Sequence, residues 1–485
     1  MSTAVKMSLM AIIISGVTFL PVANATNGYF AHGYSTAEKG LAGAGTAYSQ
    51  DAMAAATNPA GMAFIGSRMD IGLALFSPAP RGYTATGTSP ASDGDPVFVP
   101  STSLANCQFL NGDGSRCNPP FSVNSGEFES GNELFLIPFF GRNWQLNEDV
   151  ALGLSVYSNG GMNTEYLTGN ATGIDYSTLL ISDSLPGAFG DGVAGVNFEQ
   201  IFFNVSLASK LNDTDGVGVS LIFAAQRFSA KGLAQFGNFS LDPNNLSSNE
   251  HSVSYGAGLK LGYQGDVADG VRVGASYQSK INMSKFDEYA GLFAGAGEFD
   301  IPSTYNVGLA IDVGKTGVIV LDVQRINYTD TKAISNSIAA LGDGSCLDSL
   351  NATLIAASPT TLPATGAGCL GGANGAGFGW QDVTIVKLGY QFDVDDMTYR
   401  FGYSHTGEVI PESETLFNIL APAVTEHHFT AGLTARFDGN KEFSLSGLIA
   451  PKGEVTGDNP FDGGATQIEI EMFQWEVQAG WAWKY

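Results

Sequence analysis

The last fifteen residues, EMFQWEVQAGWAWKY at 471–485, alternate between apolar and polar or small side chains. A period of two residues is typical of a β-strand with one apolar face. The apolar row consists of Phe473, Trp475, Val477, Ala479, Trp481, Trp483 and Tyr485. In a soluble protein such a strand is an aggregation hazard. In a barrel that faces lipid it closes the wall, with its aromatic side chains at the membrane interface.

The same alternation recurs along the chain from Arg68 onward. It predicts fourteen strands, and an even number is typical of a single-chain bacterial barrel. We expect them at 68–77, 132–146, 149–162, 197–211, 215–235, 251–266, 269–284, 302–313, 316–330, 380–393, 396–409, 426–438, 441–452 and 471–485. Tight turns, such as Val267-Ala268 and Gly439-Asn440, alternate with long loops, such as 285–301. Turns and loops sorted in this way belong to the two sides of an outer-membrane barrel, here of a Gram-negative bacterium.

Composition narrows the possible partners. Charged residues make up 14% of the chain, and Asp and Glu exceed Lys and Arg by 25. Nucleic acid is excluded as a partner on this ground, because binding to phosphates requires Lys and Arg. We expect the partners to be hydrophobic small molecules and the lipid of the outer membrane, and the protein to be a monomer.

Residues 1–25 have the pattern of a secretory signal peptide. Lys6 is followed by an apolar run from Leu9 to Leu20, and then by the small-residue site Ala23-Asn24-Ala25. The mature chain is therefore expected to begin at Thr26. The alternative is a membrane anchor, but the apolar run is too short to span a bilayer comfortably.

The segment 26–67 is rich in Gly and Ala and lacks strand alternation. Small residues allow close packing, as a plug in the lumen of a barrel requires. The alternative is a flexible tail, but apolar residues such as Tyr29, Phe30 and Met62 argue against disorder. We therefore expect a hatch at 26–67 and a barrel at 68–485.

Four cysteines fall in two of the predicted loops. Cys107 and Cys117 lie in the first long loop, and Cys346 and Cys369 lie in the fifth. Two cysteines per loop in an exported chain predict one disulfide within each loop, and free thiols are the alternative.

Three motifs resemble one family. They are the Gly-Ala segment ending in Asn58-Pro59-Ala60-Gly61, then Gly379-Trp380-Gln381-Asp382, and then Thr398-Tyr399-Arg400-Phe401-Gly402-Tyr403. Together with the strand count, they resemble the FadL family of long-chain fatty acid outer-membrane transporters, which includes relatives that take up aromatic hydrocarbons. The resemblance implies passive uptake: capture in an apolar groove between the third and fourth outer loops, transfer to an interior pocket, and lateral exit beside a kink in the third strand.

Candidate site residues follow from this comparison and from the residue pattern. Tyr289, Leu292, Phe293 and Phe299 make loop 285–301 apolar enough to receive a ligand, although local packing of the loop explains them equally well. Gly160-Gly161 permits a kink at the end of the third strand, or is an ordinary strand end. Tyr29 and Phe30 are candidates for gating, with Asn58, Pro59, Ala60 and Gly61 anchoring the base of the hatch.

A fatty acid carboxylate requires a cation in the lumen. Strand parity turns Lys387 and Arg400 inward, and a bulge between Phe223 and Phe228 would turn Arg227 inward as well. The alternative is that these cations pair with carboxylates such as Asp322.

No catalytic constellation, phosphate loop or metal motif stands out, and no cofactor is expected. His427 and His428 are adjacent, so on a strand they face opposite ways and do not easily share a metal. An outer-membrane phospholipase or protease is the enzymatic alternative. A general porin is the transport alternative, but it needs an open lumen, which a plug at 26–67 would fill.

Overall fold

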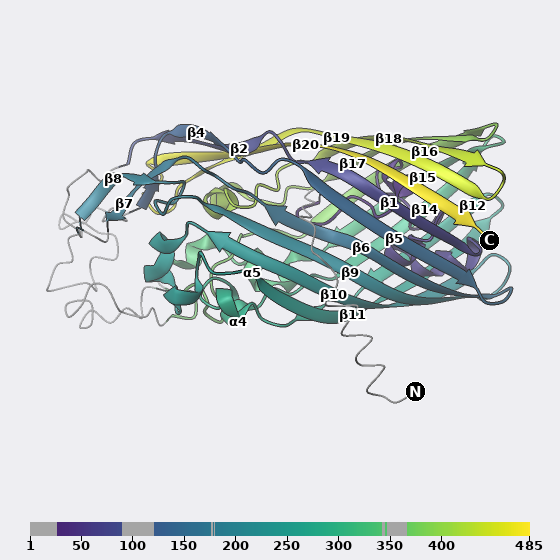
Figure 1. The fold of residues 1–485 in the computed structure, drawn as a ribbon, viewed down its shortest axis with the longest axis horizontal. Helices are drawn as coiled ribbons and strands as arrows, with labels where there is room; N and C mark the ends of the chain where they lie inside the picture. Colours follow the sequence, from purple (N-terminus) through teal and green to yellow (C-terminus); the bar gives the residue numbers. More distant parts are fainter. Residues whose placement is uncertain (1–26, 90–120, 176–177, 179, 342–344, 347–365) are drawn as a thin grey trace, which may run out of the picture.

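The computed structural model describes residues 27–89, 121–175, 178, 180–341, 345–346 and 366–485. Within them, fourteen antiparallel strands form a closed barrel (Figure 1). The wall strands are β1 (Arg68–Ser77), β5 (Phe135–Gln145), β6 (Val150–Asn163), β9 (Gly195–Lys210), β10 (Gly216–Lys231), β11 (Ser252–Ala268), β12 (Val271–Gln278), β14 (Thr304–Val313), β15 (Gly317–Ile326), β16 (Val383–Val394), β17 (Met397–Thr406), β18 (His427–Phe437), β19 (Lys441–Asp458) and β20 (Thr466–Lys484). The first strand closes the ring with the last, since Ile71 faces Phe140 on one side and Trp481 on the other. The predicted fourteen-stranded antiparallel barrel is confirmed.

The two faces of the wall are the reverse of those in a soluble protein. On β10, the Leu221 side chain is 51% exposed and points outward, whereas Ser220 is fully buried and points inward. Lipid solvates the outer face, so apolar side chains belong there. The alternation in the sequence thus indicates which side chains face the membrane.

The short turns lie at one end of the barrel and the long loops at the other. The tight turns and the C-terminus are at the right of Figure 1. We call these two ends the tight-turn end and the long-loop end. Gly314 and Gly439 have φ values of 66° and 69°, which glycine adopts without strain, and each sits in a tight turn. The turn after β11 lies at Asp269-Gly270, later than the predicted Val267-Ala268, because β11 pairs through Ala268.

At the long-loop end the strands continue beyond the barrel. β2 (Arg81–Gly87) pairs with the start of β20 and with β4 (Gly126–Glu129), so the first predicted loop is partly strand. The predicted strand 269–284 is broken, because β13 (Asn282–Met283) is separate from β12 and pairs with β11. A small separate sheet consists of β3 (Phe121–Val123), β7 (Asn170–Asp175) and β8 (Leu180–Pro186).

Short helices occupy the long loops. They are η2 (Ala234–Phe239), η3 (Pro243–Asn245), η4 (Asp287–Tyr289), α4 (Ala294–Gly297), η5 (Tyr328–Asp330), α5 (Lys332–Ser335), η6 (Ile338–Leu341), η8 (Glu412–Glu414) and α7 (Thr415–Asn418). Of the helices in the described parts of the chain, none has the length and apolar character to cross a bilayer.

Residues 27–67, the N-terminal segment, pack against the inner face of the wall. The segment contains α2 (Thr36–Lys39), α3 (Ala54–Thr57) and η1 (Pro59–Phe64). Lys39 Nζ lies 2.7 Å from Glu476 Oε1 on β20, and the backbone N–H of Thr46 donates to Asp322 Oδ2 on β15 at 2.9 Å. Inward-pointing charges on separate wall strands therefore hold this segment. The signal peptide prediction for 1–25 lies outside the described residues.

Candidate functional site

Six aromatic side chains meet where the N-terminal segment reaches the long-loop half of the barrel. This aromatic junction consists of Tyr29, Phe30, Phe198, Phe299, Tyr328 and Trp380. The ring centroids of Tyr29 and Phe198 are 5.6 Å apart at 88°, an attractive edge-to-face arrangement. Burial raises the pKa of the Tyr29 phenol, so this ring is uncharged at neutral pH. The junction is thus a neutral, largely apolar contact between the N-terminal segment and the wall.

The N-terminal segment also adds a short stretch of backbone to the edge of β6. The carbonyl of Tyr29 accepts from the N–H of Gly161 at 3.0 Å, and the N–H of Ala31 donates to the carbonyl of Asn159 at 2.8 Å. A Cβ on Gly160 would lie only 1.8 Å from the Tyr29 carbonyl oxygen. Glycine at this position therefore allows the two backbones to approach each other.

This contact lies where the wall between β5 and β6 is interrupted. The β5–β6 ladder ends at the Phe139–Tyr157 pair, and β6 changes register against β9 immediately before Gly160. The two segments are joined again where Asn132 Nδ2 donates to Asn163 Oδ1 at 2.8 Å and the N–H of Gly131 donates to the carbonyl of Glu165 at 2.8 Å. Beyond Tyr157, the backbone of β6 at Asn159 and Gly161 forms its hydrogen bonds with the N-terminal segment and not with β5.

A narrow apolar cavity lies among the long loops, at the long-loop end of the barrel. Its lining includes Val196, Phe228, Leu233, Phe236, Leu246, Leu292, Phe293, Phe378, Phe417 and Leu420. No Lys, Arg, Asp or Glu side chain is among the described residues that line it. Its free volume of about 20 Å³ suits roughly one water molecule, so a larger guest requires side chains to move.

The predicted landing surface on loop 285–301 is not exposed. Tyr289 and Phe299 are fully buried, Phe293 is nearly so, and Leu292 is half-buried in the cavity wall. The Tyr289 hydroxyl accepts from the N–H of Ala230 at 3.1 Å, which ties the loop to the end of β10. The loop therefore folds inward over the barrel mouth, and Leu292 and Phe293 line the apolar cavity instead of an outer surface.

Lys387 faces the lumen, as strand parity predicts, and there it hydrogen-bonds to the N-terminal segment. Its Nζ donates to the carbonyls of His32 at 3.3 Å and Gly43 at 3.2 Å. Asp322, its cross-strand neighbour, accepts from backbone N–H groups of the same segment. The ammonium is thus committed to backbone oxygens rather than to the apolar cavity.

Arg400 also faces the lumen, near the tight-turn end. It donates to Gln391 at 3.1 Å, Thr434 at 2.7 Å and Gln50 at 2.9 Å. It lines a separate polar cavity of about 250 Å³ together with Arg68 and other charged residues. A carboxylate at the apolar cavity is therefore not held by Arg400.

The prediction that Arg227 turns inward is wrong. β10 keeps a continuous register against β9 past this residue, without the expected bulge. Arg227 shares the outward face with Phe223 and pairs with Glu199 at 2.8 Å. The apparent change of parity arises because Phe228 faces inward and packs against the buried loop residues, with its ring 4.7 Å from that of Phe293.

Asn58 lies at the predicted base of the hatch and is fully buried. Its Nδ2 donates to the carbonyls of Thr46 at 2.7 Å and Tyr263 at 2.8 Å, and its Oδ1 accepts from the N–H of Ala60 at 3.1 Å. A Cβ on Gly61 would collide with the Ser49 hydroxyl, so a larger residue does not fit there. Pro59 begins helix η1, which packs against β9, β10 and β11.

The structure contains a disulfide between Cys346 and Cys369, and both side chains are fully buried. The next residue, Leu370, lines the apolar cavity. Cys107 and Cys117 lie outside the described residues.

Three members of the aromatic junction were not among the predicted site residues. The sequence predicts a strand position for Phe198 and a strand end for Tyr328, and it places Trp380 at the start of the predicted strand 380–393 and in a family-like motif. Trp380 donates from Nε1 to Asn418 Oδ1 at 2.6 Å. The inward parity of Phe198 is a usable signal, because Val196, Phe198 and Phe202 make the lumen-facing row of β9 apolar toward the long-loop end, unlike Asn204 and Ser206 nearer the tight turn.

Comparison with solved structures gives several matches over nearly the whole chain. The toluene transporter TodX of P. putida has a TM-score of 0.59 at 16% identity, covering 94% of this chain and 99% of that one. A FadL homologue of Pseudomonas aeruginosa gives 0.58 at 14%, and the toluene transporter TbuX of Ralstonia pickettii gives 0.54 at 14%, each with the same coverage. At these identities the likeness establishes the fold. A comparison with curated protein sequences gave no match.

A family model described as outer membrane protein transport protein (OMPP1/FadL/TodX) matches residues 17–446. This match spans most of the chain and agrees with the barrel. The family is one of transport proteins and not of enzymes. The chain therefore belongs to the OMPP1/FadL/TodX family of Gram-negative outer-membrane transporters for hydrophobic compounds.

Proposed function

We propose that this transporter takes up uncharged apolar compounds of the hydrocarbon type, in preference to long-chain fatty acids. The apolar cavity carries this proposal, because no cation lines it among the described residues. A carboxylate buried without a cationic or hydrogen-bonding partner is strongly disfavoured. The three basic residues expected to bind a carboxylate have other partners: Lys387 and Arg400 contact the N-terminal segment, and Arg227 contacts Glu199.

The names of the similar structures support the same substrate class, since two are toluene transporters. The alternative from sequence analysis, a fatty acid, is supported by the FadL homologue among them. Fatty acid uptake would require a cation to turn toward the cavity. Among the described residues, none of the cations lines the cavity, and this favours the hydrocarbon.

The proposed route starts among the long loops and passes through the apolar cavity to the aromatic junction. The cavity and the junction belong to one continuous cluster of buried apolar side chains. Beyond the junction lies the interrupted β5–β6 ladder, where Tyr29 now pairs with Gly161. Withdrawal of Tyr29 would expose this edge, and the compound would leave sideways into the membrane, down its concentration gradient.

In this proposal residues 26–67 act as a hatch. Its base is anchored by Asn58 and η1, and its tip carries Tyr29 and Phe30. Ligand can shift the hatch only if it binds the withdrawn state more tightly than the closed state. Competition between Phe30 and ligand for the same apolar cluster supplies such a difference.

The test is uptake of radiolabelled toluene and oleate into a transporter-deficient Gram-negative strain that expresses the protein. We expect a gain with toluene that exceeds any gain with oleate. An equal or larger gain with oleate would return the assignment to fatty acids. No gain with either compound would refute transport along this route. Ion conductance in planar bilayers separates a plugged carrier from a general porin, which would conduct in the resting state.

A further inference from the structure

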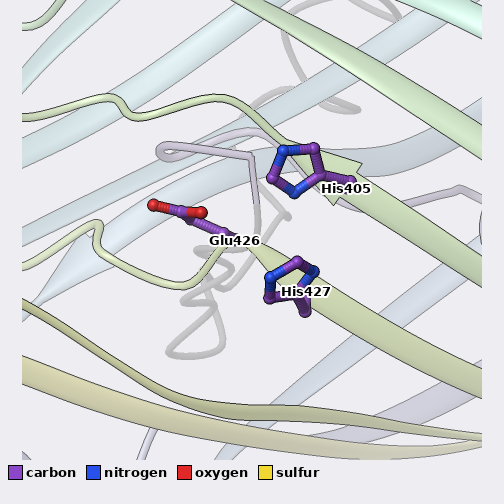
Figure 2. Close-up of side chains that lie close together, drawn as sticks. All are labelled: His405, Glu426 and His427. Atoms are coloured by element: carbon purple, nitrogen blue, oxygen red, sulfur yellow. The ribbon is translucent and has the colours of Figure 1, made fainter.

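The outer face of the barrel brings together three side chains that could hold a metal ion. His405 lies near the end of β17, His427 begins β18, and Glu426 immediately precedes His427. One ligand atom from each of the three lies within 4.8 Å of the other two. Figure 2 shows the two imidazole rings and the carboxylate gathered around one point. We propose that these residues form a binding site for a divalent transition-metal ion, with Zn²⁺ as the best match.

The β-sheet register creates this cluster. His405 and His427 are direct cross-strand partners, and their ring centroids lie 4.9 Å apart. The N–H of Thr406 donates to the carbonyl of Glu426 at 2.8 Å, so the ladder continues past the pair and holds the third residue beside it. The three positions are therefore set by the wall and not by a loose loop.

The hydrogen bonds leave nitrogens available for a metal. Nδ1 of His405 is buried and has no hydrogen-bond partner among the described residues. Nδ1 of His427 is hydrogen-bonded to the Tyr403 hydroxyl at 2.8 Å. When Nδ1 of His427 donates this bond, Nε2 presents its lone pair to a metal, and such outer partners commonly orient histidine ligands.

The chemistry and dimensions suit zinc. Two imidazoles and one carboxylate, with a fourth position for water, are an established ligand set for Zn²⁺. Bonds of about 2.1 Å place tetrahedral ligands about 3.4 Å apart, so the side chains need to close by little more than 1 Å. His427 is exposed and the other two are half-buried, and the site lies where β17 ends and β18 begins, beside the long loop that joins them.

The adjacent histidine does not share this site. His428 points into the lumen, where its ring lies 4.9 Å from that of His32. The sequence prediction that His427 and His428 do not bind one metal together is consistent with this. The partner of His427 is instead twenty-two residues away in the chain and next to it in the sheet.

The experiment is titration calorimetry of the detergent-solubilised protein, purified without a polyhistidine tag, with ZnCl₂ at neutral pH. We expect one ion per chain at this site. His405→Ala and His427→Ala should each weaken binding more than about tenfold, and Tyr403→Phe should weaken it about tenfold through loss of the ring-orienting bond. His251→Ala, which alters another histidine near the long-loop end, is the matched control and should leave binding unchanged.

The acidic cluster Glu454, Glu469 and Glu471 is the alternative binding site. Binding that persists at full strength in the His405→Ala/His427→Ala double variant would place the ion elsewhere, at these carboxylates or at the His32–His428 pair, and would overturn the proposal, as would a wild-type protein that binds no Zn²⁺. Cu²⁺ provides an independent readout, because electron paramagnetic resonance should report two nitrogen ligands in the wild type and fewer in each histidine variant. Heat-modifiable migration in electrophoresis verifies that each variant forms the barrel.

Discussion

The carbonyl oxygen of Tyr29 accepts a hydrogen bond from the backbone N–H of Gly161, 3.0 Å away. This bond joins the N-terminal segment to the wall strand β6 at the place where β6 has left its neighbour β5. The Tyr29 carbonyl thus occupies the hydrogen-bonding edge of β6, and the same residue places its ring in the aromatic junction. The predictions below test whether this arrangement gates the barrel.

Gly160→Ala should separate the N-terminal segment from β6. The added Cβ would lie 1.8 Å from the Tyr29 carbonyl, so the two backbones must move apart. We expect faster hydrogen exchange at residues 28–31, with the barrel still formed. Gly447→Ala is the matched control, because its Cβ would meet its nearest neighbour at an ordinary 3.8 Å. Equal exchange in the two variants would contradict the close contact.

Phe30→Ala should change ligand affinity without preventing assembly. The ring is 2% exposed and shares the apolar cluster with the cavity. If it competes with ligand, toluene should bind more tightly, by about tenfold for each 1.4 kcal/mol of competing contact removed. Phe437→Ala, on the lipid-facing side, should leave affinity unchanged. Unchanged affinity and uptake after deletion of residues 26–34 would show that the segment is a passive tail.

Asn58→Ala should loosen the base of the N-terminal segment. The substitution removes the side-chain hydrogen bonds to the carbonyls of Thr46 and Tyr263 and the one accepted from the N–H of Ala60. At about 1 kcal/mol for each, local stability should fall by roughly 3 kcal/mol. Local hydrogen exchange at residues 45–63 measures this loss. The exposed Asn244 provides the control, and Asn244→Ala should have little effect there.

Lys387→Met should act on the N-terminal segment and not on substrate choice. The ammonium donates to the carbonyls of His32 and Gly43, so its removal should increase exchange in this region. The ratio of oleate to toluene uptake should stay as in the wild type. A selective loss of oleate uptake would instead identify Lys387 as a carboxylate-binding residue and would weaken the hydrocarbon assignment.

Replacement of Cys346 and Cys369 by serine should loosen the loop and leave the barrel intact. The disulfide closes a loop with a sequence separation of 23, and such a link typically contributes roughly 3 kcal/mol by restricting the unfolded chain. The strand ladder does not depend on it. We expect faster proteolysis within residues 327–382 and normal heat-modifiable migration. Loss of the folded barrel would contradict this separation.

The amino-acid sequence alone was sufficient to predict the wall and its orientation. Alternation with a period of two is a local property: it assigns each side chain to lipid or lumen wherever a strand is regular, as for Leu221, Ser220 and Lys387. Where residues that face the lumen are themselves apolar, the alternation no longer shows which face points outward. Phe228 is apolar because loops cover it, and sequence parity therefore placed Arg227 on the wrong face.

Only the tertiary structure decided which residues meet. The contact of Tyr29 with Trp380, the pairing of Tyr29 with Gly161, and the approach of His405 to His427 all join positions that are distant in the chain. Such contacts depend on the stagger between strands and on how loops fold over the barrel mouth. Strand parity specifies the face of each residue but not its height along the barrel, so it does not determine these partners.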